Sequence, residues 1–413
     1  FKGNFHTHTT QSNDASDGFT TAYVVDRYHA AGYKILSLTD HDYNPYPWQL
    51  FPQYMQGVAA RDPEALGMLA IPGNELSKDN TNSWSERTGG QFNHHNDFFT
   101  GRQGQEFASL QESYAYTYAL GGMQIINHPG QYWSIDNTYS ETQKDGPGWH
   151  ATNFKTYPSL IGLEVYNQGN RRPNDRILWD QILERTMPAR PVFGYSCDDA
   201  HNDDQLFRNY NFMLMEDLTT EELKDAMRKG ETYFCYEPKG SGEGKAPRIS
   251  EIEVDEATKT ITIETDGLVY WIYGTDKTSS AASSTRSSVV GIGKTFHYNG
   301  YQGAYVRAFI TNAYGETCTQ PFGFIDSTLT NVENIHTDGE LKLFVFPNPA
   351  TEEISVMMNE ANTMDVIRVY DIEGKQVLSQ SVDGALTTLP VGHLSSGIYL
   401  VTSGSRTGKF IKD

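Results

Sequence analysis

From residue 1 to about residue 238, short apolar runs alternate with segments of helical periodicity. This alternation constrains the fold most, because strands that alternate with helices form βα units around a parallel sheet. Six or more such units favour a closed or nearly closed barrel. The strand-like runs are Asn4 to Thr9, Ile35 to Thr39, Met68 to Pro72, Met123 to Asn127, Leu160 to Tyr166 and Val192 to Tyr195. Segments with helical periodicity include Thr20 to Ala31, Gln105 to Leu120 and Asn174 to Glu184.

The pattern changes at Pro238 to Arg248, where three glycines interrupt it and no further segment of helical periodicity follows. We interpret this stretch as a linker. Residues 249 to 326 alternate as short strands between turn residues, which predicts an immunoglobulin-like β-sandwich. A second junction near Asp326 to Gly339 precedes another all-β pattern. The predicted fold is therefore α/β, with a barrel over residues 1–238 and two small all-β sandwich domains over 249–326 and 340–413.

Length and charge narrow the class of protein. A chain of 413 residues is long enough for two or three domains at about 150 residues each. Its net charge of -20 argues against holding nucleic acid by neutralising phosphates, and disfavours anionic membranes. Three widely spaced cysteines form neither a disulfide framework nor a zinc-binding pair. The start at Phe1, without an initiator Met or an apolar leader, fits a mature exported protein and fits a trimmed chain equally.

Motifs rich in His and carboxylate follow or end the predicted barrel strands, the face that holds the active site in such barrels. His6 and His8 are two residues apart on a strand, so their side chains point to one side and can bind one ion together. Asp199 and His201 repeat this spacing. The other motifs are Ser16-Asp17-Gly18, Asp40-His41-Asp42, Gly73-Asn74-Glu75-Leu76-Ser77, Asn93-His94-His95-Asn96 and Asn127-His128-Pro129-Gly130.

Any one of these motifs has a simpler structural interpretation. A single His near a strand end is more often a hydrogen-bonded structural residue, and Asp-Gly or His-Pro pairs are more often turns. Asp40 and Asp42 can also cap the following segment. Taken together, however, His or carboxylate at so many successive strand ends favours a metal site. A donor set of imidazole and carboxylate without cysteine suits Zn, Mn or Fe(II) held for hydrolysis.

Over roughly residues 1 to 236, this ordered set of motifs resembles the PHP family, named for polymerase and histidinol phosphatase domains. The resemblance implies a distorted (β/α)7 barrel and a site for two or three divalent metal ions (Zn, Mn or Fe). It also implies which residues hold the ions. A first ion would be held by His6, His8, Glu75 and Asp199, a second by Glu75, His94 and His128, and a third by Asp17, His41 and His201.

Two departures from the family pattern leave alternatives open. The segment between His8 and Asp17 is longer than in the usual form, so Asp14 competes with Asp17 as a ligand. In the insertion, His94 and His95 are adjacent, and we prefer His94 because its spacing to Phe98 is closer to that of the family's loop.

The expected chemistry follows from charge. A hydroxide bridging two metals would be the nucleophile, since metal binding lowers the pKa of water towards about 7. We predict two catalytic residues beside the metals. Asp40 would orient His41 or ligate beside it. Arg171, together with Arg172, would bind the phosphate bidentately, although a solvated basic pair that opens a helix is an equally good interpretation.

The C-terminal region resembles the sorting domain of the type IX secretion system of Bacteroidetes. The matching sequences are Phe346-Pro347-Asn348-Pro349, Val369-Tyr370-Asp371, Leu394-Ser395-Ser396-Gly397-Ile398-Tyr399 and Lys409-Phe410-Ile411-Lys412. This resemblance implies export to the outer-membrane surface or beyond, with the secretion machinery as a partner.

These features together predict an exported metal-dependent phosphoesterase acting on a phosphomonoester or phosphodiester. Its substrate would be a small molecule or a glycan- or lipid-linked ester, rather than a nucleic acid that it binds as a scaffold. One alternative is an amidohydrolase-like enzyme, although the carbamylated Lys usual at such sites is missing from the motifs. The other is a surface-binding module that retains the fold without catalysis.

Overall fold

The computed structural model describes most of the chain, in two compact units. The first contains Phe1–Glu106 and Met123–Ile325, and the second contains Phe107–Gly122 and Asp326–Asp413. The described residues are 1–12, 14–42, 61–77, 93–101, 107, 109–133, 144–275, 287–324, 343–346, 350–357, 365–372, 374–382, 386–404 and 406–412.

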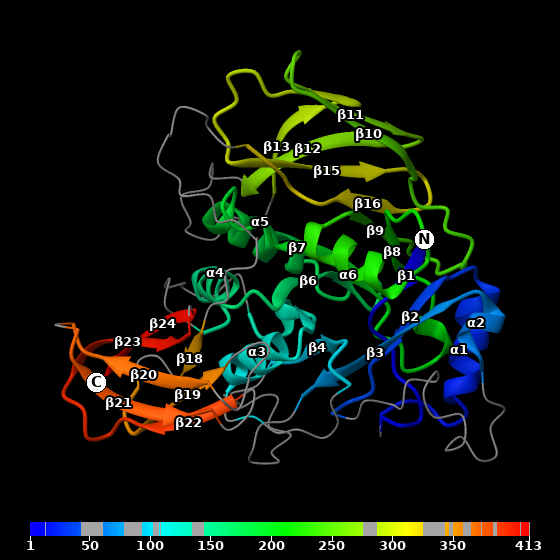
Figure 1. Ribbon diagram of the computed structural model, residues 1–413. Helices are drawn as coiled ribbons and strands as arrows, with labels where there is room; N and C mark the ends of the chain where they lie inside the picture. The colour runs from blue at the N-terminus through cyan, green and yellow to red at the C-terminus, as the bar shows by residue number, and fades with distance from the viewer. Residues whose placement is uncertain are drawn as a thin grey trace. The chain divides into compact units, whose positions relative to one another are not determined.

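Strands and helices alternate through the N-terminal part of the chain (Figure 1), as the hydrophobic pattern predicts. The strands are β1 (Lys2–Asn4), β2 (Ile35–Leu38), β3 (Leu69–Leu76), β4 (His95–Phe98), β5 (Met123–Ile126), β6 (Leu160–Asn167), β7 (Phe193–Cys197), β8 (Asn209–Met213) and β9 (Thr232–Tyr236). The helices are α1 (Thr21–Ala30), α2 (Pro63–Leu66), α3 (Leu110–Ala119), α4 (Pro147–Thr156), α5 (Asp175–Thr186) and α6 (Thr220–Lys229), with short 3-10 turns η2 (Pro129–Gln131) and η3 (Asp203–Gln205).

These strands form one sheet in the order β9-β8-β1-β2-β3-β4-β5-β6-β7. The predicted parallel pairing holds for β1-β2-β3 and for β5-β6-β7. Two strands that were not predicted pair differently: β4 is antiparallel to both of its neighbours, and β8 is antiparallel to β1. The insertion that we predicted to be irregular therefore contains a strand. Strand β1 is also shorter than predicted, and it ends before His6 and His8.

Strands β7 and β8 are not neighbours in this order, yet a side chain joins them. The Asn211 amide accepts a hydrogen bond from Ser196 N (3.1 Å) and donates one to Ser196 O (2.7 Å). The Gln320 amide likewise accepts a hydrogen bond from Gly194 N and donates one to Gly194 O, both at 2.8 Å. A buried backbone N–H or C=O group without a partner costs free energy. These two side-chain amides therefore supply the hydrogen bonds that a neighbouring strand would otherwise give to β7.

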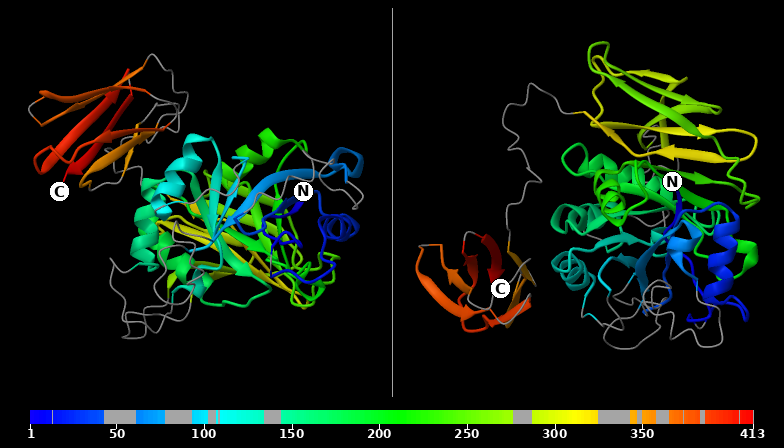
Figure 2. Two further views of the ribbon diagram at one scale, coloured as in Figure 1. Left: turned by 90° about the horizontal axis from the view of Figure 1, so that it is seen from below. Right: turned by 45° about the vertical axis from the view of Figure 1, so that its right-hand side comes forward.

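Part of the segment 249–324 continues this sheet, and part of it forms a separate three-stranded sheet. The antiparallel pairing of β16 with β9 runs from Glu316↔Tyr236 to Thr319↔Tyr233. In Figure 1 and in the right-hand view of Figure 2 the strands of residues 249–324 form a layer on one side of β1 to β9, and α5 lies against this layer. The strands are β10 (Ile249–Asp255), β11 (Thr260–Thr265), β12 (Leu268–Thr275), β13 (Ser287–Ile292), β14 (Thr295–His297), β15 (Tyr305–Thr311), β16 (Glu316–Thr319) and β17 (Phe322–Gly323).

A buried ion pair ties this layer to α5. Arg307 on β15 donates from Nε and Nη2 to the two carboxylate oxygens of Asp180, each at 2.7 Å. Both side chains are almost completely buried. Around Trp271, the layer has its own apolar core, which includes Ile263, Val306 and Ile310. The predicted all-β character is thus present, within the same compact unit as β1 to β9.

The link through Gln320 gives a testable prediction. Gln320→Ala leaves the buried N–H and C=O of Gly194 without their partners, so we expect the free energy of unfolding to fall by about 1–3 kcal/mol. Chemical denaturation measures this change. The exposed Gln302 is a matched control, because Gln302→Ala removes only a local bond to Gly300 O. Equal stability of the two variants would contradict the role assigned to Gln320.

The second unit contains an all-β domain at the C-terminus. Its apolar core includes Ile354, Val356, Val369, Val401 and Phe410. The strands form a three-stranded and a four-stranded sheet. They are β18 (Phe344–Phe346), β19 (Glu353–Met357), β20 (Val366–Tyr370), β21 (Gln376–Ser381), β22 (Leu386–Pro390), β23 (Gly397–Ser403) and β24 (Arg406–Lys412).

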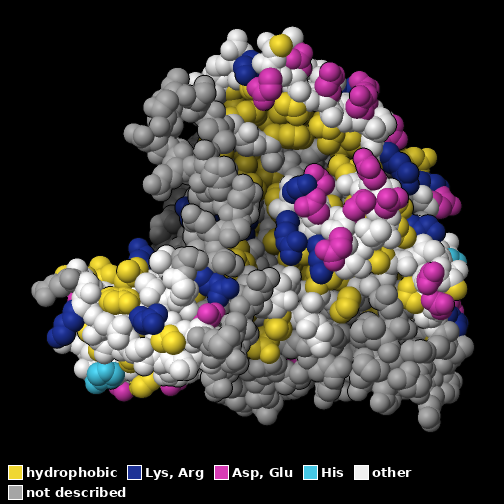
Figure 3. All heavy atoms as spheres, in the orientation of Figure 1, with side chains coloured by type: hydrophobic (Ala, Val, Ile, Leu, Met, Phe, Trp, Pro, Cys, Tyr) yellow, Lys and Arg dark blue, Asp and Glu magenta, His cyan; other side chains and the backbone are white. Residues whose placement is uncertain are grey.

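Charged side chains of both signs occur on the surface of the described residues. On the face drawn in Figure 3, Asp and Glu side chains lie interleaved with Lys and Arg side chains. Among the described helices, none is long and apolar enough to cross a membrane.

Candidate metal centre

The site begins where β1 ends. The segment after β1 is held against the segment after β7 by hydrogen bonds from His8 N to Ala200 O and from Asp199 N to His6 O, both 2.9 Å. This places His6, His8 and Asp199 on one side, all buried. His6 Nε2 lies 3.2 Å from His8 Nε2, and Asp199 Oδ1 lies 3.3 and 3.1 Å from these two nitrogens.

The other nitrogen of each ring is already bonded. His6 Nδ1 contacts Glu164 Oε1 at 2.7 Å, and His8 Nδ1 contacts Ser12 Oγ at 2.9 Å. When these contacts hold the ring protons at Nδ1, both Nε2 atoms present lone pairs to each other and to Asp199. Buried acceptors that converge in this way need shared protons or a cation between them. The donor set therefore fits a divalent metal ion.

Glu75, near the end of β3, is the centre of the cluster. Its carboxylate is 1% exposed and lies within 3.3 Å of a ring nitrogen of five histidines. Three of these contacts are with His41 Nδ1 (3.1 Å), His94 Nδ1 (3.0 Å) and His128 Nε2 (3.3 Å). The other two histidines are His6 and His8. One carboxylate shared by so many imidazoles has the geometry of a bridging ligand.

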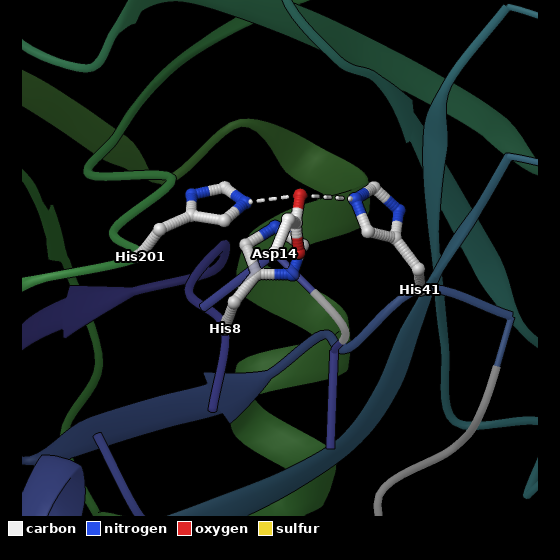
Figure 4. Close-up of side chains that lie close together, drawn as sticks. All are labelled: His8, Asp14, His41 and His201. Carbon is white, nitrogen blue, oxygen red and sulfur yellow. Dashed lines mark hydrogen bonds and ion pairs between the residues drawn. The ribbon is translucent and has the colours of Figure 1, made fainter. Parts of the chain in front are cut away.

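The outer part of the cluster is shown in Figure 4. Asp14 lies between His41 and His201, with Oδ2 at 3.3 Å from His41 Nε2 and 3.0 Å from His201 Nε2. The rings of His8 and His201 stack with centroids 4.0 Å apart. Asp14 is half exposed, whereas His8 is buried. The cluster is therefore closed towards β1 and open towards Asp14.

Ligand-type atoms in three overlapping groups lie close enough to share ions. Within each group these atoms lie within 4.8 Å of one another. Neighbouring groups share His8, His41 or Glu75, so ions held there would be adjacent. The groups are His6, His8, Glu75 and Asp199; His8, Asp14, His41 and His201; and His41, Glu75 and His94.

Asp14, and not the predicted Asp17, lies in the cluster. Asp17 is exposed and lines a hollow of about 450 Å³ together with Asn202, Asp203 and Tyr23. The long segment after His8 folds back through bonds such as Ser16 N to His201 O (2.9 Å), which brings Asp14 to the ligands. His94 lies in the cluster as preferred, whereas His95 Nδ1 contacts Asn93 O at 3.1 Å.

Of the two predicted catalytic residues, Asp40 lies behind the ligands. Its carboxylate accepts bonds from Thr9 N (2.6 Å), Thr9 Oγ1 (2.8 Å) and Ser12 N (3.1 Å). It thereby holds the loop that carries Ser12, whose hydroxyl accepts from His41 N (3.0 Å). This geometry fits the capping alternative, with an indirect effect on His8 and His41.

Arg171 lies at the rim of the site. It is exposed and donates to Gln168 Oε1 (2.6 Å), while Gln168 Nε2 donates to Asp199 O (2.9 Å). Arg172 is half-buried and donates to Gln131 Oε1 at 3.4 Å. One arginine is thus linked to the Asp199 segment and the other to the turn after His128.

Charge in the cluster is strongly coupled. Burial opposes protonation of His6, yet Asp199, Glu75 and Glu164 raise its pKa well above the ordinary value. The pKa values of His8, His41 and His201 are also raised against burial by neighbouring carboxylates. Burial alone would raise the pKa of Glu75, but the surrounding histidines lower it well below its usual range. The carboxylates thus stabilise positive charge in this buried space, whether it is carried by protons or by metal ions.

Sequence reasoning missed the residues that support the ligands. Glu164 on β6 contacts His6, Ser12 contacts His8, and Asn127 Nδ2 donates to Glu75 Oε1 at 2.8 Å. A signal for Glu164 is present in the sequence, because it is the only charged residue in the apolar run Leu160 to Tyr166. Neither Ser12 nor Asn127 carries a comparable signal.

Residues 344–413 match the family described as the secretion system C-terminal sorting domain. The C-terminal all-β domain is therefore a sorting domain. The protein is accordingly exported by type IX secretion to the cell surface or the extracellular space.

Among curated proteins, none matches the chain. Solved structures are similar at low identity. The lesion-specific endonuclease PfuEndoQ from Pyrococcus furiosus is 16% identical, with a TM-score of 0.35, over 55% of this chain and 56% of that chain. The chain thus spans about half the length of that endonuclease. A putative metal-dependent phosphoesterase from Bifidobacterium adolescentis is 14% identical, with a TM-score of 0.31, over 48% of this chain and 87% of that chain. Dimeric latent PorU from Porphyromonas gingivalis is 13% identical, with a TM-score of 0.15, over 44% and 23%. Likenesses this distant bear on neither activity nor substrate.

Proposed function

We propose that the chain is an exported, metal-dependent phosphoesterase that hydrolyses a phosphomonoester or a phosphodiester. The observation that carries this proposal is the position of Glu75, one buried carboxylate within 3.3 Å of five imidazoles. A structural ion pair needs only one imidazole, whereas five imidazoles around one carboxylate fit a ligand shared by more than one metal ion.

Three sets of residues would hold the ions, and together they account for the whole cluster. Asp14 replaces Asp17 in the third set because it alone reaches His41 and His201. The sets are His6, His8, Glu75 and Asp199; Glu75, His94 and His128; and Asp14, His41 and His201.

Bound divalent ions supply Lewis acidity, which lowers the pKa of water and offsets charge on phosphoryl oxygens. The chain's own residues supply the rest. His6, His8 and Glu75 are almost completely buried, so the inner end of the site excludes bulk water. Arg171 and Arg172 at the rim carry the positive charge that would orient a phosphate group entering from solvent.

Export narrows the range of substrates that the enzyme would meet. The enzyme would meet phosphate esters outside the cell, such as those of nutrients, glycans or lipids, rather than metabolic intermediates. The net charge of -20 disfavours polyanions that need many phosphate contacts. Nucleic acid is therefore not the proposed substrate.

The proposal is tested with p-nitrophenyl phosphate and bis-p-nitrophenyl phosphate, using protein loaded with Mn or Zn. We expect turnover of at least one ester, dependent on the metal, and a loss of more than about 100-fold in His41→Ala. His29→Ala is the matched control, since His29 is exposed on α1 away from the cluster, and it should keep full turnover.

Turnover that survives in His41→Ala, or that does not depend on metal, would contradict the assignment. Hydrolysis of carboxylic esters or amides by the loaded protein, with both phosphate esters left intact, would support an amidohydrolase-like enzyme instead.

A further inference from the structure

Glu164 is a buried carboxylate that the proposed reaction does not use. It lies in the middle of β6 and is completely buried. Three groups contact it: Oε1 contacts His6 Nδ1 at 2.7 Å, and Oε2 accepts from His128 N and from Asn167 Nδ2, both at 2.8 Å.

Each of these contacts leads to a candidate ligand by a different path. The first fixes the ring of His6, because a proton held at Nδ1 by the carboxylate leaves Nε2 with its lone pair facing His8 and Asp199. The second holds the backbone of His128 at the end of β5. The third continues through Asn167 Nδ2, which also donates to Asp199 Oδ2 at 3.1 Å.

We propose that Glu164 is a positioning residue of the metal centre, which sets the tautomer of His6 and aligns His6, His128 and Asp199 as ligands. This inference rests on the proposed function only in taking these three residues as ligands. Its alternative is a carboxylate that merely satisfies buried donors of the β6 strand. The two roles differ in metal affinity, because an outer carboxylate that orients a ligating imidazole typically contributes 10- to 100-fold.

The test compares two Glu→Gln variants that make the same chemical change, one at Glu164 and one at Glu316 on β16. Glu164→Gln keeps the size of the side chain but replaces one acceptor oxygen with an NH2 group. Glu316→Gln alters the carboxylate that accepts a hydrogen bond from Tyr166 Oη (2.6 Å), and Tyr166 lies two residues after Glu164 on β6. The dissociation constant of Zn²⁺ is measured for each full-length protein by competition with a chromophoric chelator, and the unfolding midpoint of the metal-free proteins is measured alongside.

We expect Glu164→Gln to lower the affinity for Zn²⁺ 10- to 100-fold. The Glu316→Gln variant should bind Zn²⁺ as tightly as the unsubstituted protein. Equal Zn²⁺ affinity in the two variants would overturn the inference. Because affinity is measured without substrate, this outcome is distinct from a failure of the proposed hydrolysis.

A second measurement applies even when Glu164→Gln does not fold. Nitrogen NMR of the unsubstituted, Zn-loaded protein with labelled histidines reports the tautomer of each ring. The inference requires a proton on Nδ1 of His6. A proton on Nε2 of His6 would overturn it, since that nitrogen could then bind no ion.

Discussion

Glu75→Gln is expected to abolish hydrolysis and to release metal ions at the same time. The substitution preserves the shape of the side chain but removes the single negative charge that faces five imidazoles. Loss of a supporting residue costs 10- to 100-fold in metal affinity, so loss of the shared ligand itself should exceed about 100-fold in both affinity and turnover. Elemental analysis after dialysis and turnover of the better p-nitrophenyl ester measure the two effects.

The matched control is Glu237→Gln. Glu237 is also buried, but it contacts Lys245 N (2.8 Å) and Tyr210 Oη (3.3 Å), outside the cluster. This variant should lose stability while keeping its metal and its turnover. A Glu75→Gln protein with unchanged metal content would show that Glu75 is not a ligand.

Asp180→Asn should be the most destabilising single substitution proposed for this chain. It leaves the guanidinium of Arg307 charged and almost completely buried, without its bidentate partner. Breaking a buried pair on one side costs about 3–5 kcal/mol. Because this pair joins α5 to β15, both β1 to β9 and the strands of residues 249–324 should lose structure at a lower urea concentration.

The double variant Asp180→Leu with Arg307→Met provides the control. Removing both charges leaves no unpaired ion, so much of the lost stability should return. A single Asp180→Asn variant within about 1 kcal/mol of the unsubstituted protein would mean that Arg307 finds another partner or reaches water.

The strand-end motifs could be predicted from sequence because both the period of the apolar runs and the position of His after each run are local features. The Nε2 atoms of His6 and His8 lie 3.2 Å apart although β1 ends before both residues, whereas Asp199 and His201 belong to different groups of ligand-type atoms. The choice of Asp14 could not be predicted, because it depends on how the segment after His8 folds back on the His201 loop. The Ser16-Asp17-Gly18 motif favours Asp17, whereas the long-range contact with His201 places Asp14 in the cluster.

Long-range pairing was also beyond sequence reasoning. The alternation in residues 249–324 predicts strands, but nothing local predicts that β16 pairs with β9 and continues the same sheet. Gln320 and Asn211 likewise read as ordinary polar residues, although each replaces part of a β-ladder on β7. Glu164 is the exception, since a lone charge in an apolar strand signals a buried partner.

The most direct test of the metal centre is anomalous X-ray diffraction from crystals of the Mn- or Zn-loaded protein. The account predicts two or three adjacent peaks, with one between His6, His8, Glu75 and Asp199, and a neighbouring one beside Asp14, His41 and His201. Peaks confined to other parts of the molecule, or none in a protein shown to be loaded, would contradict it.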